Sequence, residues 1–429
     1  MLRNLIILYL KLKRGLKRIN NYKEVRKNNM AKIMAVNAGS SSIKFQLLEM
    51  PEETVIASGV MERIGLAEGI FTLKYDGKKE ETHPVLPTHA EGVQLLLDTL
   101  VEKGIVKSLD EISGVGHRVV QGGEYFKDST LVDGPDGVVV QKIQDLADLA
   151  PLHNPAHIIG IKAFYKALKN VPQVVVFDTV FHQTMPEEAY MYATPYEWYE
   201  KYGIRKYGAH GTSHKYVSQR AAELIGKPLE DTKIIVCHLG NGASISAVEG
   251  GKCKDTSMGL TPLEGIPMGT RSGNLDPTVV SYICEKENKT AAEVVNILNK
   301  KSGYLGMSGR SNDARDVTAG MNAGDHRCKL TFDVQAKRIV DYIAAYYVYM
   351  GGCDVIAFTA GMGENLKHLR LNVAKRLGAL GVEIDEKLND TFSDERKIST
   401  PNSKIQLWII PTNEEVMIAR DTVRVANIK

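Results

Sequence analysis

The 429-residue sequence has no apolar run of the roughly 18–20 residues that a membrane-spanning helix requires. Its five cysteines are odd in number and have no CxxC spacing, so they predict neither a disulfide framework nor a zinc ribbon. The sequence also lacks a GxxxxGK[ST] P-loop and a GxGxxG turn after a strand. These absences predict a cytoplasmic protein with no membrane partner. Any nucleotide site must therefore hold phosphate groups in another way.

Acidic residues are almost missing from the first thirty positions. Residues 1–30 contain nine Lys and Arg residues against Glu24 alone, a charge of +8, whereas the whole chain carries +3. The remaining 399 residues therefore carry −5, which argues against a nucleic-acid partner. The apolar stretch at 5–10 is short and precedes the basic residues, unlike a secretory signal. We expect residues 1–29 to be an extension outside the fold, with a membrane-surface helix as the alternative.

From Lys32 onward, short apolar runs alternate with amphipathic segments, which predicts an α/β fold. A chain of this length predicts two domains. Helices are expected at 89–103 and 331–350, and Thr290 with Glu293 forms a capping box for a helix ending near Lys300. Buried strands are expected at 33–36, 43–48, 115–120, 174–177, 233–239, 354–359 and 407–410.

Two segments that lie 201 residues apart resemble each other. KIMAVNAGSSSI starts at Lys32 and KIIVCHLGNGASI starts at Lys233, and each reads as a strand, a turn of small residues and a second strand. Such an echo predicts a duplicated domain. Two duplicated domains that face each other across a cleft would point both turns at one ligand.

Turns of small residues follow three of the expected strands, at 37–44, 238–242 and 361–365. The backbone N–H groups and hydroxyls of such turns can form an anion-binding concavity. An ordinary hairpin is the alternative for each turn taken alone. Three such turns together predict a phosphate-binding site.

Phosphoryl transfer also needs cations beside the transferring group and a carboxylate for a metal ion. Arg118 and Arg271 lie among glycines, which favours contact with a ligand over contact with solvent. Pairing with a structural carboxylate is the alternative for each arginine. Asp178 and Glu414 follow expected strands, so their carboxylates can reach a cleft.

Two pairs of histidines have the i, i+4 spacing of metal ligands, His153/His157 and His210/His214. Neither pair encloses a glutamate as in HExxH, and no cysteine lies close by, so we do not expect a zinc site. His210 precedes Ser213, which is the expected N-cap of a helix, and is predicted to point into a cleft. His214 is predicted to be structural.

Eight short motifs occur in order along the chain: NAGSSSIK (37–44), GHRVV (116–120), APLHNP (150–155), FDTVFH (177–182), HGTSH (210–214), HLGNG (238–242), MGTRSG (268–273) and TNEE (412–415). With these motifs the sequence resembles the acetate kinase family of short-chain carboxylate kinases from about Met30 to the C-terminus. The resemblance implies reversible phosphoryl transfer from ATP to acetate, with Mg²⁺, for which Mn²⁺ may substitute, in a homodimer. It also implies the duplicated actin-like, ribonuclease H-like fold of acetate and sugar kinases, heat-shock ATPases and actin. We expect domains at 31–180, joined by a C-terminal helix at 415–429, and at 181–414.

The resemblance also implies a role for each matching residue. Asp178, His210 and Arg271 are the implied catalytic residues, and Asn37 and Glu414 the implied metal-site residues. Asp178 matches a residue usually called the proton donor or acceptor, but acetate is already ionised near pH 7, so we expect Asp178 to orient Arg118 or metal-bound water. The implied substrate-binding residues are Arg118, Val120, Leu152, Ala209 and Pro267. The implied nucleotide-binding residues are Lys44, His238, Leu239, Gly240, Asn241, Gly242, Asp313, Ala314, Arg315, Gly361, Met362, Gly363, Glu364 and Asn365.

The sequence departs from the family pattern at three positions. Gln121 stands where His is usual, Asn274 where Asp is usual, and Ala209 where Phe is usual. The loss of a Phe removes a wall of the acyl pocket, so a propionate or butyrate kinase is the alternative within the class. Two alternatives come from other classes of protein. The first is a non-catalytic ATP-dependent clamp on the same fold, which the paired arginines disfavour because such clamps lack them. The second is a metallohydrolase, which metal analysis would reveal.

Overall fold

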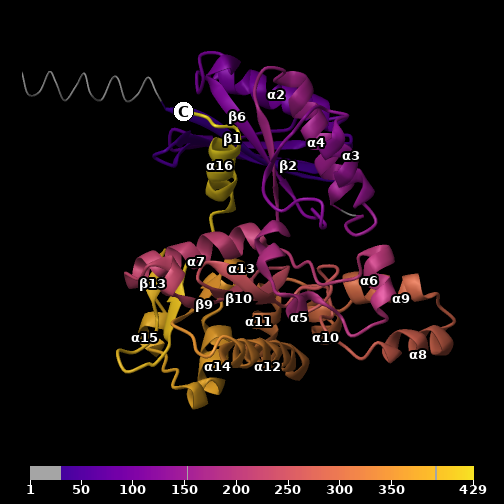
Figure 1. Cartoon of the computed structure of the whole chain (residues 1–429), viewed down its shortest axis with the longest axis vertical. Helices are drawn as coiled ribbons and strands as arrows, with labels where there is room; N and C mark the ends of the chain where they lie inside the picture. Colours follow the sequence, from indigo (N-terminus) through magenta and orange to yellow (C-terminus); the bar gives the residue numbers. More distant parts are fainter. Residues whose placement is uncertain (1–29, 152, 392–393) are drawn as a thin grey trace, which may run out of the picture.

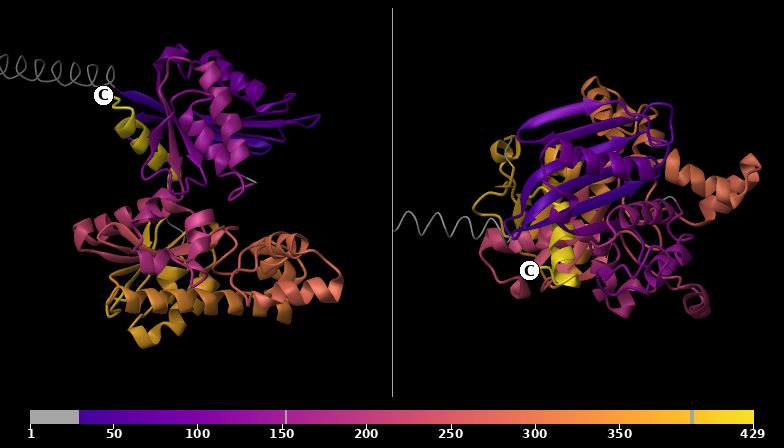
Figure 2. Two further views of the ribbon diagram at one scale, coloured as in Figure 1. Left: turned by 45° about the vertical axis from the view of Figure 1, so that its right-hand side comes forward. Right: turned by 90° about the horizontal axis from the view of Figure 1, so that it is seen from above.

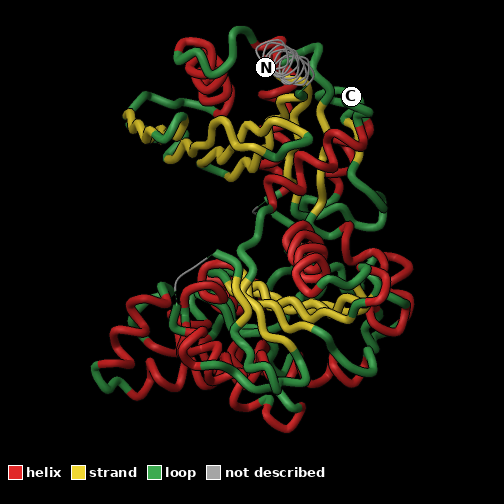
Figure 3. The backbone as a smooth tube through the Cα atoms, turned by 90° about the vertical axis from the view of Figure 1, so that its left-hand side faces the viewer, coloured by secondary structure: helices red, strands yellow, loops and turns green. Residues whose placement is uncertain are grey.

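The structure, a computed structural model, describes residues 30–151, 153–391 and 394–429. The described chain forms two α/β lobes, one above the other in Figure 1, and each lobe contains one mixed β-sheet. The lobes are also distinct in the left view of Figure 2 and in Figure 3, with few segments crossing between them. No helix in the described ranges is both long enough and apolar enough to cross a membrane. The basic residues 1–29, and the expectation placed on them, lie outside the described part of the chain.

The first sheet has the strand order β5-β4-β3-β2-β1-β6-β8-β7. β1 and β2 form an antiparallel hairpin, and β6 continues the sheet in parallel with β1. The central strands β1, β6 and β8 carry buried side chains on both faces, because helices cover each face there. The strands are β1 (Ala31–Gly39), β2 (Ser42–Met50), β3 (Thr54–Glu62), β4 (Ile70–Tyr75), β5 (Lys78–Thr82), β6 (Ile112–Val119), β7 (Thr130–Leu131) and β8 (Gln173–Phe177).

Helices cover both faces of this sheet. Met34 and Val36 pack with α2 (His89–Glu102) and α4 (Asn154–Ala167), while Ile33 and Ala35 pack with α16 (Glu414–Val425) at the end of the chain. α16 lies so close to β6 that a side chain at Gly116 would collide with Ile418 and Thr422. The first lobe also contains α3 (Val138–Asp145).

The second sheet repeats the first, with the order β11-β10-β9-β12-β14-β13. β9 and β10 form an antiparallel hairpin, β12 is parallel to β9, and β14 is parallel to β12. In the first sheet, β1, β2, β6 and β8 run in the same relative directions as β9, β10, β12 and β14 in the second. The predicted duplication is therefore confirmed. The strands are β9 (Lys233–Leu239), β10 (Ala243–Glu249), β11 (Lys252–Thr256), β12 (Val355–Thr359), β13 (Arg396–Lys397) and β14 (Gln406–Ile409).

Helices also cover both faces of the second sheet. Ile234 and Val236 pack with α7, whereas Ile235 and Cys237 pack with α12. The capping box of Thr290 and Glu293 at the start of α9 is confirmed. The helices between β8 and β14 are α5 (Glu187–Tyr190), α6 (Tyr196–Tyr202), α7 (Gly211–Ile225), α8 (Thr278–Glu287), α9 (Ala291–Lys300), α10 (Gly303–Ser308), α11 (Ala314–Asn322), α12 (His326–Tyr349), α13 (Ala360–Asn365), α14 (Lys367–Arg376) and α15 (Glu386–Asn389).

Three local predictions were wrong. Residues 361–365 belong to the short helix α13 and do not form a turn. Ala360, which directly follows β12, has a left-handed φ of 63°, and the helix begins at this residue. Ser213 is not an N-cap, because α7 begins at Gly211 and His210 takes the cap position with a φ of 58°. The helix expected at 331–350 begins earlier, at His326, because Asp325 caps it by accepting from Arg327 and Cys328.

Candidate active site

Arg118 and Asp178 form an ion pair at the ends of two neighbouring parallel strands. Arg118 lies in β6, and Asp178 follows β8, where its backbone N–H donates to the Val119 carbonyl at 2.9 Å. Arg118 donates to the Asp178 carboxylate through Nε at 3.1 Å and Nη2 at 2.6 Å. Bonds through two nitrogens fix the plane of a guanidinium. Asp178 therefore orients Arg118, whose Nη1 has no partner among the described residues.

Three carboxylates gather where α16 begins. Glu414 is the first residue of α16; burial raises its pKa, Asp178 and Glu415 act in the same direction, and Arg118 opposes them. Glu415 accepts from Lys44 Nζ at 2.6 Å. Asn37 pairs with Lys44 across the β1–β2 hairpin, and β1 lies beside β6. Three carboxylates thus face two cations, which leaves an excess of negative charge.

His210 and His238 lie stacked at the opening of the second lobe, with ring centroids 4.2 Å apart. His210 Nδ1 lies 2.8 Å from Ser244 Oγ in β10, and His238 Nδ1 lies 2.8 Å from Ser213 Oγ in α7. Burial lowers the pKa of His210 well below its ordinary value, and His238, His214 and two arginines act in the same direction. His210 is therefore neutral near pH 7.

Arg271 projects from the loop of residues 268–273 and has no carboxylate partner in the described chain. Its Nη1 donates to the Pro262 carbonyl at 3.3 Å, and burial lowers its pKa. An arginine remains cationic at neutral pH even so. A Cβ placed on Gly242 would lie 3.4 Å from both Arg271 Nη1 and His210 Nε2, so both groups lie close to the β9–β10 turn at Gly242.

Arg118 and Arg271 face the same space from opposite lobes. Both guanidinium groups lower the pKa of His210, and both lower the pKa of the half-buried His153 at the start of α4, after the larger effect of burial. Asp178 also accepts, through its backbone carbonyl, from the Gly211 N–H at 2.9 Å, which joins the first lobe to the start of α7. The lobes therefore bring two cations and a neutral imidazole to one place.

The segments predicted to bind a nucleotide lie next to this place. Asn241 accepts from the Gly269 N–H at 3.0 Å, so the β9–β10 turn contacts the Arg271 loop. A Cβ on Gly363 in α13 would lie 3.6 Å from the Cys237 carbonyl of β9, and one on Gly269 would lie 3.2 Å from the Asn312 carbonyl. Asp313 caps α11 and pairs with the exposed Arg315, and this pairing lowers the pKa of Asp313 to about 2. The structure thus brings residues 238–242, 313–315 and 361–365 together.

A buried arginine supports α13 from behind. Arg370 in α14 is 1% exposed and donates to the Gly363 carbonyl at 2.8 Å and to Asn389 at 2.8 and 2.9 Å. Burial lowers the pKa of Arg370 to about 10. These bonds hold the carbonyl of a predicted nucleotide-binding segment in place.

We expect Arg370→Met to lower the free energy of unfolding by about 3 kcal/mol, because several buried acceptors lose a charged donor. The measurement is urea unfolding followed by circular dichroism. Lys375→Met on the exposed face of α14 is the control, since its pair with Glu386 is open to solvent on both sides. A change below about 1 kcal/mol for Arg370→Met would contradict the structural role.

Three of the four residues predicted to line an acyl pocket are buried, and the fourth, Leu152, lies outside the described residues. Val120 is 6% exposed, and Pro267 is buried and accepts from Gln335 through its carbonyl at 3.0 Å. Ala209 is 3% exposed and belongs to the same apolar cluster as Met258, Ile266 and Met268. Neighbouring side chains therefore surround Ala209.

The two other departures from the family pattern have structural partners. Gln121 is buried, and its side chain accepts from the Gly123 N–H at 2.9 Å, which shapes the turn after β6. Asn274 accepts from the Gly265 N–H at 2.7 Å and donates to Tyr342 at 2.9 Å. An ionised aspartate has no donor, so it could bond Tyr342 only by accepting from the tyrosine hydroxyl.

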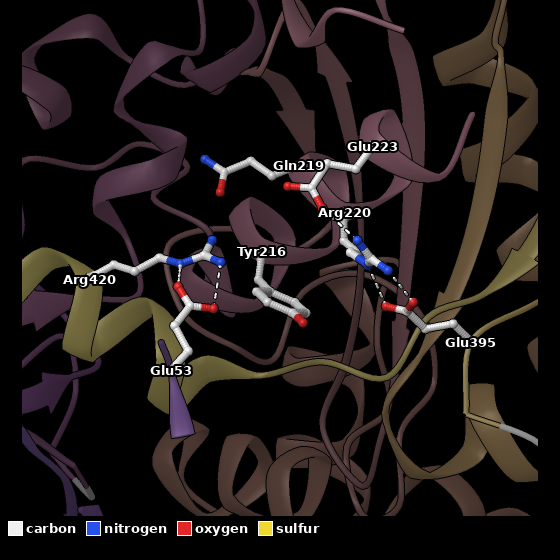
Figure 4. Close-up of a pocket in the computed structure, with 7 residues that line it drawn as sticks. All are labelled: Glu53, Tyr216, Gln219, Arg220, Glu223, Glu395 and Arg420. Atoms are coloured by element: carbon white, nitrogen blue, oxygen red, sulfur yellow. Dashed lines mark hydrogen bonds and ion pairs between the residues drawn. The ribbon is translucent and has the colours of Figure 1, made fainter. Parts of the chain in front are cut away.

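A separate cavity of about 340 Å³ lies beside α7 and α16. Figure 4 shows that each of its arginines already has a carboxylate partner, Arg420 with Glu53 and Arg220 with Glu395. Tyr216 lies between the two pairs. The arginines of this cavity are therefore occupied, unlike Arg271. The cavity is lined by Glu53, Tyr216, Gln219, Arg220, Glu223, Glu395 and Arg420.

Sequence reasoning missed two residues that contact the site. Ser244 touches His210, but a serine in an apolar strand gives no signal about what it faces. His153 takes the cap position of α4 beside both arginines, and its i, i+4 spacing to His157 pointed instead to a metal pair. In the described ranges, no three His, Cys, Asp or Glu residues lie close enough together to hold a metal ion by themselves.

Comparison with known proteins gives consistent matches. A model of the acetokinase family matches residues 32–420. An acetate kinase of Bacillus cytotoxicus is 59% identical over 399 residues, which are 93% of this chain and the whole of that protein. The crystal structure of a Porphyromonas gingivalis acetate kinase matches with a TM-score of 0.87 and 44% identity, and covers 92% of this chain and 100% of its own. A propionate kinase from Francisella tularensis matches with a TM-score of 0.86 and 42% identity over the same shares. The expected duplicated actin-like fold is thereby confirmed.

Proposed function

Because the chain belongs to the acetokinase family, we propose that it transfers the γ-phosphoryl group of ATP to the carboxylate of acetate. The products are acetyl phosphate and ADP, and the reaction is reversible. The observation that carries this proposal is the convergence of Arg118 and Arg271 from opposite lobes on His210, with the buried Glu414 near Arg118. ATP is the co-substrate, and a divalent metal is needed.

Arg118 binds the acetate carboxylate, and Asp178 holds the guanidinium in the plane that this contact needs. Acetate is ionised near pH 7, so its oxygen attacks the γ-phosphorus without giving up a proton. A new P–O bond forms to acetate while the bond to the β,γ-bridging oxygen breaks, and the electron pair leaves with ADP. Asp178 therefore acts through Arg118 and not as a base.

Arg271 and His210 stabilise the transferring group. Its equatorial oxygens carry the charge in the transition state, so catalysis depends on positioned donors. Arg271 supplies a cation that no carboxylate of the described chain neutralises, and His210 supplies a neutral ring nitrogen at the same point over Gly242. The segments 238–242, 313–315 and 361–365, with Lys44, hold the nucleotide.

The divalent metal is Mg²⁺ in this proposal, and Mn²⁺ may substitute for it. The residues present fit such an ion, because Glu414, Asp178 and Glu415 supply more negative charge than Arg118 and Lys44 compensate. Asn37 and Glu414 would hold it, since Mg²⁺ prefers oxygen donors and few protein ligands. When bound, the ion neutralises charge on the phosphate oxygens. A homodimer and domains at 31–180 and 181–414, with α16 added to the first, belong to the same proposal.

The test is the formation of acyl phosphate, trapped with hydroxylamine, from acetate and ATP with Mg²⁺. Acetyl hydroxamate should form only when all three are present. ADP formation without any hydroxamate would contradict the proposed acceptor. Propionate and butyrate in the same assay measure the acyl preference.

Propionate is the second candidate substrate, because Ala209 replaces a usual ring and the propionate kinase of Francisella tularensis has a similar structure. If space remains beside Ala209, one extra methylene contributes about 0.8 kcal/mol and favours propionate several-fold in KM. Ala209→Phe should then shift the ratio of kcat/KM values back toward acetate. An unchanged acetate-to-propionate ratio would show that Met258, Ile266 and Met268 already fill the space and that position 209 does not set acyl size.

A further inference from the structure

Ser244 links the partly exposed His210 and the buried His214 through a single hydroxyl group. Its Oγ lies 2.8 Å from His210 Nδ1 and 2.7 Å from His214 Nε2. Ser244 and His214 are fully buried, and the described residues offer the hydroxyl no further partner. The proton of each of these two hydrogen bonds must therefore come from His210, Ser244 or His214.

The single hydroxyl proton limits the possible arrangements. If both histidines donated to Ser244, its own proton would have no acceptor in the described structure. If both accepted, one bond would have no proton. One histidine therefore donates to the serine oxygen, and the other accepts from the serine O–H.

The unpaired nitrogen of His214 selects between the two directions. His214 Nδ1 is buried and has no hydrogen-bond partner among the described residues. Burial also lowers the pKa of His214 well below its ordinary value, so the ring carries one proton. If Ser244 donated to His214 Nε2, that one proton would sit on Nδ1 as an orphaned buried donor. Orphaned N–H groups are rarer and less tolerated than unpaired acceptors. The proton of His214 is therefore on Nε2 and points to Ser244.

We propose that Ser244, supported by His214, is a positioning residue that fixes His210 in the tautomer with its proton on Nε2. Ser244 donates to His210 Nδ1, so the opposite nitrogen carries the N–H. His210 Nε2 and Arg271 Nη1 each lie 3.4 Å from the position of a Cβ on Gly242. The inference rests on the proposed function, because it gives His210 a donor aimed at the transferring phosphoryl group. The other tautomer would present a lone pair to an anion.

Nitrogen-15 NMR of histidine-labelled protein without substrate tests the tautomer directly. His210 is assigned from the signal that disappears in His210→Asn, and its proton is expected on Nε2. A proton on Nδ1, or an even mixture of tautomers, would overturn the inference. The result is independent of whether acetyl phosphate forms. Failure of the proposed activity and failure of the inferred His210 tautomer are therefore distinguishable.

Ser244→Ala provides the kinetic test. We expect kcat to fall about three- to tenfold with little change in KM for acetate, together with a mixed His210 tautomer in the NMR spectrum. Ser246→Ala is a matched control, because Ser246 is equally buried in β10 but bonds Thr256 Oγ1 at 2.8 Å. Ser246→Ala should leave both the His210 tautomer and kcat unchanged. An unchanged His210 tautomer in Ser244→Ala, or the same loss in both variants, would contradict the role of Ser244.

Discussion

Replacing Arg271 by alanine is expected to lower kcat about 10²–10³-fold while leaving the fold intact. Removal of one positioned donor to developing charge costs about 3–4 kcal/mol in the transition state. Arg271 is the stronger case of the two arginines, because no carboxylate in the described chain pairs with it and its recorded acceptors are the neutral Pro262 carbonyl and Met268 sulfur. Its charge is therefore available to the transferring group. Steady-state kinetics of acetyl phosphate formation measure the effect.

The control for Arg271→Ala is Arg338→Ala, on the exposed face of α12. Arg338 lies 3.7 Å from Asp341 and is half exposed, so its loss should leave kcat unchanged. Circular dichroism and melting temperature should match the unaltered protein for both variants. If Arg271→Ala turned over at a near-normal rate with normal folding, Arg271 would not contact the transition state.

Replacing Arg118 by alanine is expected to lower kcat/KM for acetate about 10²–10³-fold, by loss of a charged donor that the acceptor carboxylate needs. The KM for ATP should change far less, because Arg118 lies in the first lobe and the predicted nucleotide segments lie in the second. Kinetics with each substrate varied in turn separate the two effects. An equal rise in the KM for acetate and in the KM for ATP would contradict a carboxylate-binding role.

A double-mutant cycle shows whether Asp178 acts through Arg118. Asp178→Asn alone should reduce kcat/KM, because the guanidinium loses the partner that orients it. In the Arg118→Ala background the same change should have little further effect, since residues in one network are not additive. Full additivity of the two losses would show that Asp178 has a separate task, such as proton transfer.

The central strands could be predicted from the sequence because their signal is local. β1, β9 and β12 carry buried side chains on both faces, so they read as short apolar runs. β3, β4, β5 and β11 were not among the expected strands. Arg118 and Asp178 could be placed near a cleft, because parallel strands end at one edge of a sheet. The contact of Asp178 with Arg118 was expected only through the family resemblance, because the two residues are 60 positions apart and no local pattern links them.

The errors in the predicted site arise from backbone geometry. His210 has a left-handed φ, which few non-glycine residues adopt, and α7 begins directly after it, ahead of Ser213. Ala360 does the same for α13, which reads from its glycines as a turn. The Ser244 contact joins β10 to α7 across 30 or more residues. Such pairings depend on how the whole lobe packs.

The central claim, direct attack of acetate on the γ-phosphorus, is tested most directly with acetate labelled by oxygen-18 in both carboxylate oxygens. Phosphorus-31 NMR should show acetyl phosphate with one labelled oxygen bonded to its phosphorus, and ADP as the second product. AMP and pyrophosphate as products, or phosphate without the label, would contradict the account.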